Sequence, residues 1–329
     1  MNAFSAAIIA RRVILDRLHE DGTSLYRLFN GATEGQPGLT IDRYGPNLLF
    51  QSWRDAPSID EVRRIHALLQ ELLGLDLGVC FYDRSKRGAL KRPLVEPAAQ
   101  EMIGKELGLQ FHVDLEHRGI DPLLFLDFRA ARRRVRSDAR GKSVLNLFSY
   151  TCGIGVAALA GGAESVCNVD FAEHALSIGR KNAELNDLSP ERFEILKEDC
   201  IPVMRQFAGL GVKGRAAKRR FIKLQPRQFD FVVLDPPRYA KSPFGLVDTV
   251  NDYQSLFKPA LLATKPGGQM LVTNNVASVA LEDWLALLKR AAEKAGRLVS
   301  HIDVVSPEDD FPSFDGSHPL KMALLDIAD

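Results

Sequence analysis

The sequence predicts an α/β fold in which a doubly wound parallel sheet follows a small α+β domain. The first observation is a short apolar run at residues 144–148, followed by a loop holding Gly153 and Gly155 and by a helical segment from Val156. The second observation is that three later apolar runs each lead to an acidic residue. These acids are Asp170, Asp199 and Asp235. Strand, glycine loop, helix, strand and acid in this order are typical of sheets that bind a nucleotide-like ligand.

The length and composition are those of an ordinary globular protein. The chain has 329 residues, of which 46% are hydrophobic and 26% are charged, with a formal net charge of +1. This length predicts two domains, which we expect at residues 1–112 and 113–329. No apolar run is long enough to span a bilayer, and the N-terminus lacks the apolar core of a signal peptide. A cytoplasmic location is therefore expected. As separate expectations, the protein is a monomer or homodimer and binds no membrane.

Cysteine usage predicts a reduced protein without a zinc site. The four cysteines are Cys80, Cys152, Cys167 and Cys200. They are scattered along the chain and form no CxxC pair, so neither a disulfide framework nor a metal site is indicated.

The first part of the chain has the pattern of a small α+β domain. Apolar side chains at helical spacing predict one amphipathic helix over residues 1–22, and the acids Asp16, Glu20 and Asp21 disfavour a transit peptide. The other elements expected here are strands at 39–44, 48–53 and 75–82 and a helix at 59–73.

Two segments are unusually rich in basic residues. Residues 83–93 hold five, and residues 212–228 hold seven without one acid. The seven are Lys213, Arg215, Lys218, Arg219, Arg220, Lys223 and Arg227. A solvated loop is the simpler interpretation, but this density favours contact with an anionic macromolecule. We therefore expect Lys218, Arg219 and Arg220 to contact the substrate.

The glycine loop is compatible with either S-adenosylmethionine or a dinucleotide. The segment Gly153–Ala158 satisfies the dinucleotide pattern, and Asp170 follows at about the right distance. However, the loop before Gly153 is longer than a pyrophosphate turn. Hydride-transfer enzymes have no use for the motif Asp235-Pro-Pro237 after the fourth strand. Methyltransferases use this motif to fix the methionine end of the cofactor and the acceptor base. We therefore expect S-adenosylmethionine.

Two residues of the expected cofactor site have alternative roles. Arg129 is either a ligand or a structural anchor, and Asp199 either meets the adenine or caps the next helix. The residues expected to contact the cofactor are Arg129, Phe148, Tyr150, Thr151, Gly153, Gly155, Asp170, Phe171, Asp199, Cys200 and Asp235.

Several motifs along the chain carry a specific resemblance in combination. They are Phe125-Leu-Asp-Phe-Arg129, Val144-Leu-Asn-Leu-Phe-Ser-Tyr-Thr-Cys-Gly153, Asp170, Asn182-Ala-Glu-Leu-Asn186 and Asp235-Pro-Pro-Arg238. Together they resemble the class I methyltransferases that act on bacterial large-subunit ribosomal RNA. The match extends from about Leu25 to Leu325, and the N-terminal PUA module of many members is missing. The resemblance implies a Rossmann-like catalytic sheet, S-adenosylmethionine as cofactor and 23S ribosomal RNA as partner.

The acceptor atom is predicted from a departure within that family. Its cytosine-C5 members carry a cysteine nucleophile in the turn after the strand that ends here at Thr273, because cytosine C5 is a poor nucleophile. Here that turn begins with Asn274-Asn275, which is similar to the family's guanine-N7 members. We therefore expect a nitrogen acceptor, with Asp235, Asn274 and Asn275 as catalytic residues. A plain turn is the alternative interpretation of the two asparagines.

Arg238 and Tyr239 follow the two prolines and are expected to contact the RNA by phosphate pairing and by base stacking. Three other functions stay open at this point. They are methylation of another base or RNA, RNA binding without catalysis, and a dehydrogenase that would bind NAD instead.

Overall fold

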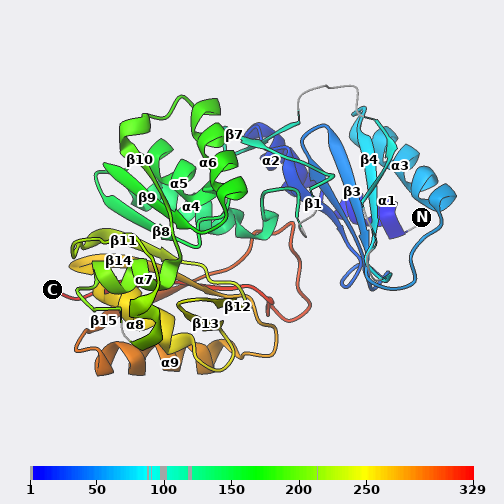
Figure 1. Ribbon diagram of the computed structural model, residues 1–329. Helices are drawn as coiled ribbons and strands as arrows, with labels where there is room; N and C mark the ends of the chain where they lie inside the picture. The colour runs from blue at the N-terminus through cyan, green and yellow to red at the C-terminus, as the bar shows by residue number, and fades with distance from the viewer. Residues whose placement is uncertain (1–2, 87–88, 90, 97–101, 118–120, 213) are drawn as a thin grey trace. The chain divides into compact units, whose positions relative to one another are not determined.

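The computed structural model describes residues 3–86, 89, 91–96, 102–117, 121–212 and 214–329 (Figure 1). The chain forms two compact units. The N-terminal unit comprises residues 1–129 and 308–317, and the C-terminal unit comprises residues 130–307 and 318–329. None of the helices in the described ranges is long and apolar enough to cross a membrane.

The N-terminal unit is an α+β structure, as predicted. Its strands are β1 (Leu25–Asn30), β2 (Leu39–Tyr44), β3 (Asn47–Ser52), β4 (Gly78–Asp83) and β5 (Arg92–Val95), in this order in one sheet, and β6 (Ile103–Glu106) paired with β7 (Leu109–His112). Its helices are α1 (Ala3–Ala10), α2 (Arg12–Glu20), α3 (Ile59–Leu73) and the short η1 (Leu126–Phe128). Ser58 caps α3 by accepting from the Glu61 backbone N–H at 3.2 Å, and Gly74 ends it with a φ of 65°.

The single helix predicted over residues 1–22 is wrong, because the chain breaks at Arg11 into α1 and α2. The Arg11 side chain is buried. Its Nε donates to Glu34 Oε1 at 2.9 Å, and its Nη1 donates to the backbone oxygens of Arg27 and Asp310 at 3.0 and 2.7 Å. The charged residue at the break is therefore turned into the unit.

The N-terminal unit extends past the predicted boundary at residue 112, because the unit includes a buried ion pair at its far end. Arg129 is 1% exposed, and its guanidinium donates to Glu308 Oε2 at 2.7 Å, to the Leu25 carbonyl at 2.8 Å, and to Asp310 Oδ1. Burial raises the pKa of Asp310 to about 6 despite the neighbouring Arg129 cation. Residues 308–317 therefore belong with β1, although the chain reaches them from the other unit.

The C-terminal unit is built on a seven-stranded sheet with both faces covered. In sheet order the strands are β10 (Phe193–Lys197), β9 (Ser165–Asp170), β8 (Ser143–Leu147), β11 (Phe229–Leu234), β14 (Thr264–Asn274), β16 (Lys321–Ile327) and β15 (Val299–Val305). The first five are parallel, and β16 is antiparallel to both of its neighbours. This order confirms the predicted doubly wound sheet.

Helices α5 and α6 cover one face of this sheet, and α7, α8 and α9 cover the other (Figure 1). The helices of the unit are α4 (Arg129–Asp138), α5 (Gly153–Ala160), α6 (Glu173–Leu185), α7 (Cys200–Phe207), α8 (Tyr253–Leu262), α9 (Leu281–Lys294), η2 (Pro190–Arg192) and η3 (Gly214–Lys218). The hairpin of β12 (Tyr239–Ser242) and β13 (Gly245–Asp248) stands apart from the main sheet. Because five strands run parallel, their carboxyl ends meet at one edge.

At the amino-terminal ends of the parallel strands, Asp230 links three neighbouring strands. Its carboxylate accepts from the Ser143 backbone N–H at 2.9 Å, from the Ser143 hydroxyl and from Lys265 Nζ at 2.8 Å. Partial burial opposes ionisation, but these donors outweigh it and lower the pKa of Asp230 to about 2. One carboxylate therefore links the starts of β8, β11 and β14.

The Arg129→Met variant should lower the free energy of unfolding by about 3–5 kcal/mol, because it leaves buried carboxylates without their counter-ion. The matched control is Arg17→Met, which removes the exposed pair with Asp309 at 2.9 Å and should cost less than about 1 kcal/mol. Urea denaturation followed by circular dichroism measures both. Similar losses in the two variants would contradict the role given to Arg129.

The Asp230→Asn variant should lose about 1 kcal/mol of stability at pH 7, a value reduced for the partial exposure of the carboxylate. The pKa of Asp230 is lower in the folded protein than in the unfolded chain. Its contribution is therefore present above about pH 4 and lost as the pH falls toward 2. Urea midpoints of variant and wild type at pH 7 and pH 3 measure this. An equal difference at both pH values would contradict the assignment.

Candidate functional site

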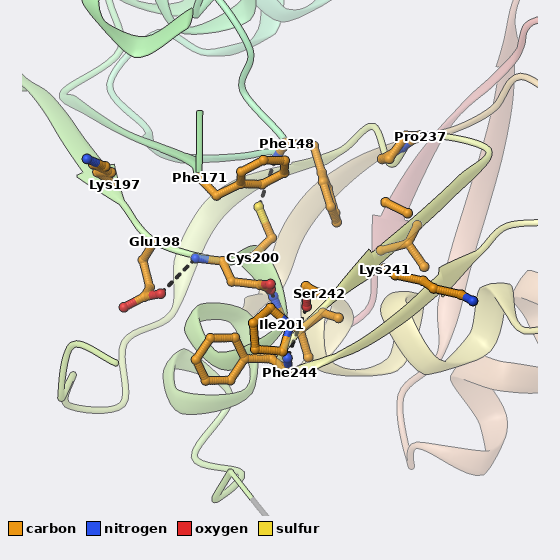
Figure 2. Close-up of a pocket in the computed structure, with 14 residues that line it drawn as sticks. Phe148, Phe171, Lys197, Glu198, Cys200, Ile201, Pro237, Lys241, Ser242 and Phe244 are labelled. Atoms are coloured by element: carbon orange, nitrogen blue, oxygen red, sulfur yellow. Dashed lines mark hydrogen bonds between the residues drawn. The ribbon is translucent and has the colours of Figure 1, made fainter. Parts of the chain in front are cut away.

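A cavity of about 350 Å³ lies at the carboxyl edge of the parallel strands in the C-terminal unit (Figure 2). Its lining residues lie at or just after the ends of β8, β9, β10 and β11, at the start of α7, or in the β12–β13 hairpin. They are Phe148, Phe171, Lys197, Glu198, Asp199, Cys200, Ile201, Pro237, Ala240, Lys241, Ser242, Pro243, Phe244 and Val247. The volume and the mainly apolar lining are those of a small-molecule site.

Two aromatic rings form part of the cavity wall. Phe148 directly follows β8, and Phe171 directly follows β9. Phe171 is 65% exposed, although it is large and apolar. An exposed aromatic ring at the wall of a cavity offers a flat ligand a stacking surface.

The loop between β8 and α5 has an unusual backbone. Phe148, Tyr150 and Cys152 have φ values of 59°, 49° and 60°, in the left-handed region that favours glycine. Each costs on the order of 1–2 kcal/mol unless the surroundings hold it in place. Here the Ser149 backbone N–H donates to the Val169 carbonyl at 3.0 Å, and that of Cys152 donates to the Ser149 carbonyl at 2.8 Å.

Asp170 holds this loop from the end of β9. Its two carboxylate oxygens accept from the backbone N–H groups of Tyr150 and Ala172, each at 2.9 Å. Burial raises the pKa of Asp170 against the effect of these hydrogen bonds. A carboxylate has about four acceptor positions, so Asp170 can also accept from the hydroxyls of a ligand.

Asp199 and Cys200, which follow β10, form hydrogen bonds at the start of α7 and with residues at the ends of β8 and β9. Asp199 Oδ1 accepts from the Ile201 backbone N–H at 2.8 Å, so Asp199 caps α7 and also lines the cavity. The helix-cap alternative is therefore confirmed. The Cys200 sulfur accepts from the Phe148 backbone N–H at 3.2 Å (Figure 2) and donates to the Val169 carbonyl at 3.4 Å.

Close packing explains one of the two predicted glycines. A Cβ on Gly155 would lie 2.2 Å from Asn168 Oδ1, which already accepts from Asn146 Nδ2 at 2.9 Å. Gly155 therefore lets α5 approach β9. Gly179, which the sequence analysis missed, lets α6 approach Cys152, because a Cβ on Gly179 would lie 2.4 Å from the Cys152 sulfur.

Asp235 is positioned by the neighbouring strand. It follows β11, and one carboxylate oxygen accepts from the Thr273 hydroxyl of β14. The Thr273 carbonyl in turn accepts from the buried Tyr253 hydroxyl at 2.8 Å. Arg238 and Tyr239 are exposed two and three residues beyond the first proline.

The β12–β13 hairpin was not predicted, although it supplies Ala240 and Val247 to the cavity. Its turn contains Pro243 and Gly245 between two short runs. Turn residues between short alternating segments are a hairpin signal.

The two asparagines after Thr273 differ in environment. The Asn274 side chain is fully buried; its Nδ2 donates to the Thr249 carbonyl at 3.0 Å, and its Oδ1 accepts from the Val276 backbone N–H at 3.0 Å. Both polar ends of the Asn274 side chain are therefore bonded within the protein, which favours the plain-turn alternative, and its catalytic contact with a base stays a prediction. Asn275 is exposed.

Arg129, Thr151 and Gly153, which were predicted to contact the cofactor, do not line the cavity. The Nε, Nη1 and Nη2 atoms of Arg129 all donate hydrogen bonds within the N-terminal unit, which favours the structural-anchor alternative over a cofactor ligand. Thr151 and Gly153 are buried, and the Thr151 carbonyl accepts from Asn182 Nδ2 at 3.1 Å. Among the described residues, no group of three or more histidine, cysteine or acidic side chains could hold a metal ion.

The four cysteine thiols are buried. Burial raises the pKa of Cys80 and Cys152 to about 12 and raises the pKa of Cys167 and Cys200 as well. Thiols of this kind are poor nucleophiles, because the thiolate is the reactive form.

Known structures share this fold. SMU.776, named as a methyltransferase and complexed with SAH, aligns with a TM-score of 0.79 and 24% identity over 98% of this chain and 80% of that chain. A structure from Streptococcus mutans named as SAM-dependent methyltransferase aligns with a TM-score of 0.78 and 23% identity, with the same coverage of 98% and 80%.

The relatives found by sequence are also named as methyltransferases. The chain is 30% identical over 302 residues to Ribosomal RNA large subunit methyltransferase I of Escherichia coli strain SMS-3-5, covering 89% of this chain and 71% of that protein. It is 29% identical to the protein of the same name from Klebsiella pneumoniae strain 342, covering 89% and 70%. Residues 95–326 match the family model described as S-adenosylmethionine-dependent methyltransferase. The chain therefore belongs to this methyltransferase family, and S-adenosylmethionine, rather than a dinucleotide, is its cofactor.

Proposed function

We propose that this protein transfers the methyl group of S-adenosylmethionine to a base of large-subunit ribosomal RNA, in the cytoplasm. The observation that carries the proposal is the cavity at the carboxyl edge of the sheet, which lies next to Asp235-Pro-Pro237. The names of the sequence relatives support ribosomal RNA as the substrate.

The residues around the cavity fit the three parts of the cofactor. Phe148 and Phe171 offer apolar faces to the adenine, between β8, β9 and the start of α7. Asp170 accepts from the ribose hydroxyls, as an acid at the end of the second strand does in nucleotide-binding sheets. The loop containing Tyr150 faces the methionine end. When bound, the cofactor supplies an electrophilic methyl group on a sulfonium.

Asp235 orients the acceptor. Its bond from the Thr273 hydroxyl fixes one carboxylate oxygen and leaves the group half-buried at the sheet edge. Tyr239, which is 53% exposed, stacks on a base that has left its helix, and Arg238 pairs with a phosphate. These residues position the base for transfer without supplying a nucleophile.

Guanine N7 is the proposed acceptor atom, because its methylation needs no thiolate and the four cysteine thiols are buried. Methylation at cytosine C5 needs a thiolate to add to the ring, and all four cysteines are buried with raised pKa values. Guanine N7 has a lone pair and no proton, so alignment with the methyl group is enough. Asn275 holds the edge of the base, while Asn274 fixes the turn through Thr249 and Val276.

The Phe171→Ala variant should weaken binding of S-adenosylmethionine roughly 5- to 100-fold, which corresponds to the loss of one aromatic stacking surface. Isothermal titration calorimetry measures the change. The control is Phe314→Ala, which removes an aromatic side chain that is 83% exposed and does not line the cavity. Equal affinities of the two variants would contradict the adenine assignment.

Incubation with isotopically labelled S-adenosylmethionine and unmodified 23S ribosomal RNA should place the label in 7-methylguanosine. Nucleoside mass spectrometry identifies the product. The Asn275→Ala variant should then lower kcat at least tenfold, because an edge contact made in the transition state is lost. Label in 5-methylcytidine would refute the nitrogen acceptor. No label in RNA, with the cofactor bound, would refute RNA as the substrate.

A further inference from the structure

The segment from Gly211 to Gln228 joins α7 to β11 and holds seven basic residues and no acid. Lys213 lies outside the described residues. Such a run repels itself, so an uncompensated run costs stability unless an anion is bound there. The cofactor site does not account for these charges, because none of the described residues of the segment lines its cavity.

Two of the cations already have partners. Arg227 Nη1 lies 3.1 Å from Glu194 Oε2, and its guanidinium lies 4.4 Å from the centre of the Phe229 ring. Lys223 Nζ lies 3.6 Å above the centre of the Phe221 ring. These two side chains stabilise the segment itself.

Lys218, Arg219 and Arg220 are different. All three are exposed, and none forms an ion pair with an acid in the part of the chain that the structure describes. They are consecutive, with Lys218 as the last residue of η3, so they present three adjacent positive charges to the solvent.

The segment is fastened to the walls of the cofactor cavity. The Ile222 backbone N–H donates to Glu198 Oε2 at 2.8 Å, and the Phe221 ring packs edge-on against Phe244 at 5.8 Å. Glu198 and Phe244 both line the cavity (Figure 2). Lys218, Arg219 and Arg220 directly precede the anchoring residues Phe221 and Ile222, so the three exposed cations are held near the cavity.

A second set of bonds keeps the segment in place. Gln206 of α7 donates from Nε2 to the Ile222 carbonyl at 3.0 Å and accepts at Oε1 from the Leu224 backbone N–H at 3.1 Å. The bonds fix the backbone directly after Arg220.

We infer that Lys218, Arg219 and Arg220 form a docking surface for the phosphate backbone of the substrate RNA. This inference rests on the proposed function, since the methyl acceptor is taken to be RNA. The charge identifies the ligand class: adjacent cations without acids match the regular negative charge of a nucleic-acid backbone. Such contacts position the RNA and carry no sequence information themselves.

The triple variant Lys218→Ala, Arg219→Ala, Arg220→Ala tests the docking surface. Filter binding of in-vitro transcribed 23S ribosomal RNA should show at least a tenfold loss of affinity at about 0.1 M salt. The slope of log K against log salt should fall in magnitude by about 2–3, since each lost phosphate contact contributes roughly 0.7–0.9. KM for the RNA should rise, with kcat within about twofold.

The matched control removes three exposed cations of the same unit, Lys289, Arg290 and Lys294 of α9, and makes the same change in net charge. The control variant should keep the wild-type RNA affinity and salt slope. Calorimetry should give both variants the wild-type affinity for S-adenosylmethionine. The single variant Arg219→Ala should lower the slope by roughly one contact.

Equal RNA affinities and slopes in the two triple variants would overturn the docking surface, as would a loss of cofactor affinity in the first variant. Failure of the wild-type protein to methylate 23S ribosomal RNA would instead count against the proposed function. The two failures are distinguishable, because the binding titration requires no methyl transfer.

Discussion

The site depends on the reversal of strand order at β8. From β8 the chain builds outward through β9 to β10, and then returns to add β11 and β14 on the other side. Connections from neighbouring strands therefore leave toward opposite faces, and a crevice opens between them at the carboxyl edge. Phe148, Phe171, Asp199 and Pro237 follow four of these strands, so residues far apart in sequence converge at one cavity.

Strand ends could be predicted because their signals are local. Apolar runs followed by Asp170, Asp199 and Asp235 mark both the strands and the edge at which ligands bind, and the structure confirms all of these strands. The capping role of Asp199 was foreseen as one of two alternatives, because an acid before a helix has a known local use. Phe148 and Phe171 were predicted from the same positions, whereas the part of the cavity wall formed by the β12–β13 hairpin was not.

Features set by distant contacts could not be predicted in this way. Asn274 has a sequence neighbourhood typical of a site, but its burial depends on Thr249, which is 25 residues away. The break between α1 and α2 coincides with hydrogen bonds from Arg11 to Glu34 and to the Asp310 carbonyl. The apolar residues alone continue at helical spacing through Arg11, so the sequence pattern does not reveal the break. The left-handed backbone at Phe148 is likewise held by a distant residue, because its N–H donates to the Cys200 sulfur of α7 and nothing in a phenylalanine side chain favours a positive φ.

The ion pair of Arg129 and Asp310 also constrains how the chain is made. The two residues are 181 positions apart. At roughly 5–20 residues per second, a ribosome needs on the order of 10–40 s to add the second after the first. During that interval the N-terminal unit has its sheet but not its closing segment. Arg129 is then hydrated, and the last step of folding of this unit waits for nearly complete synthesis of the chain.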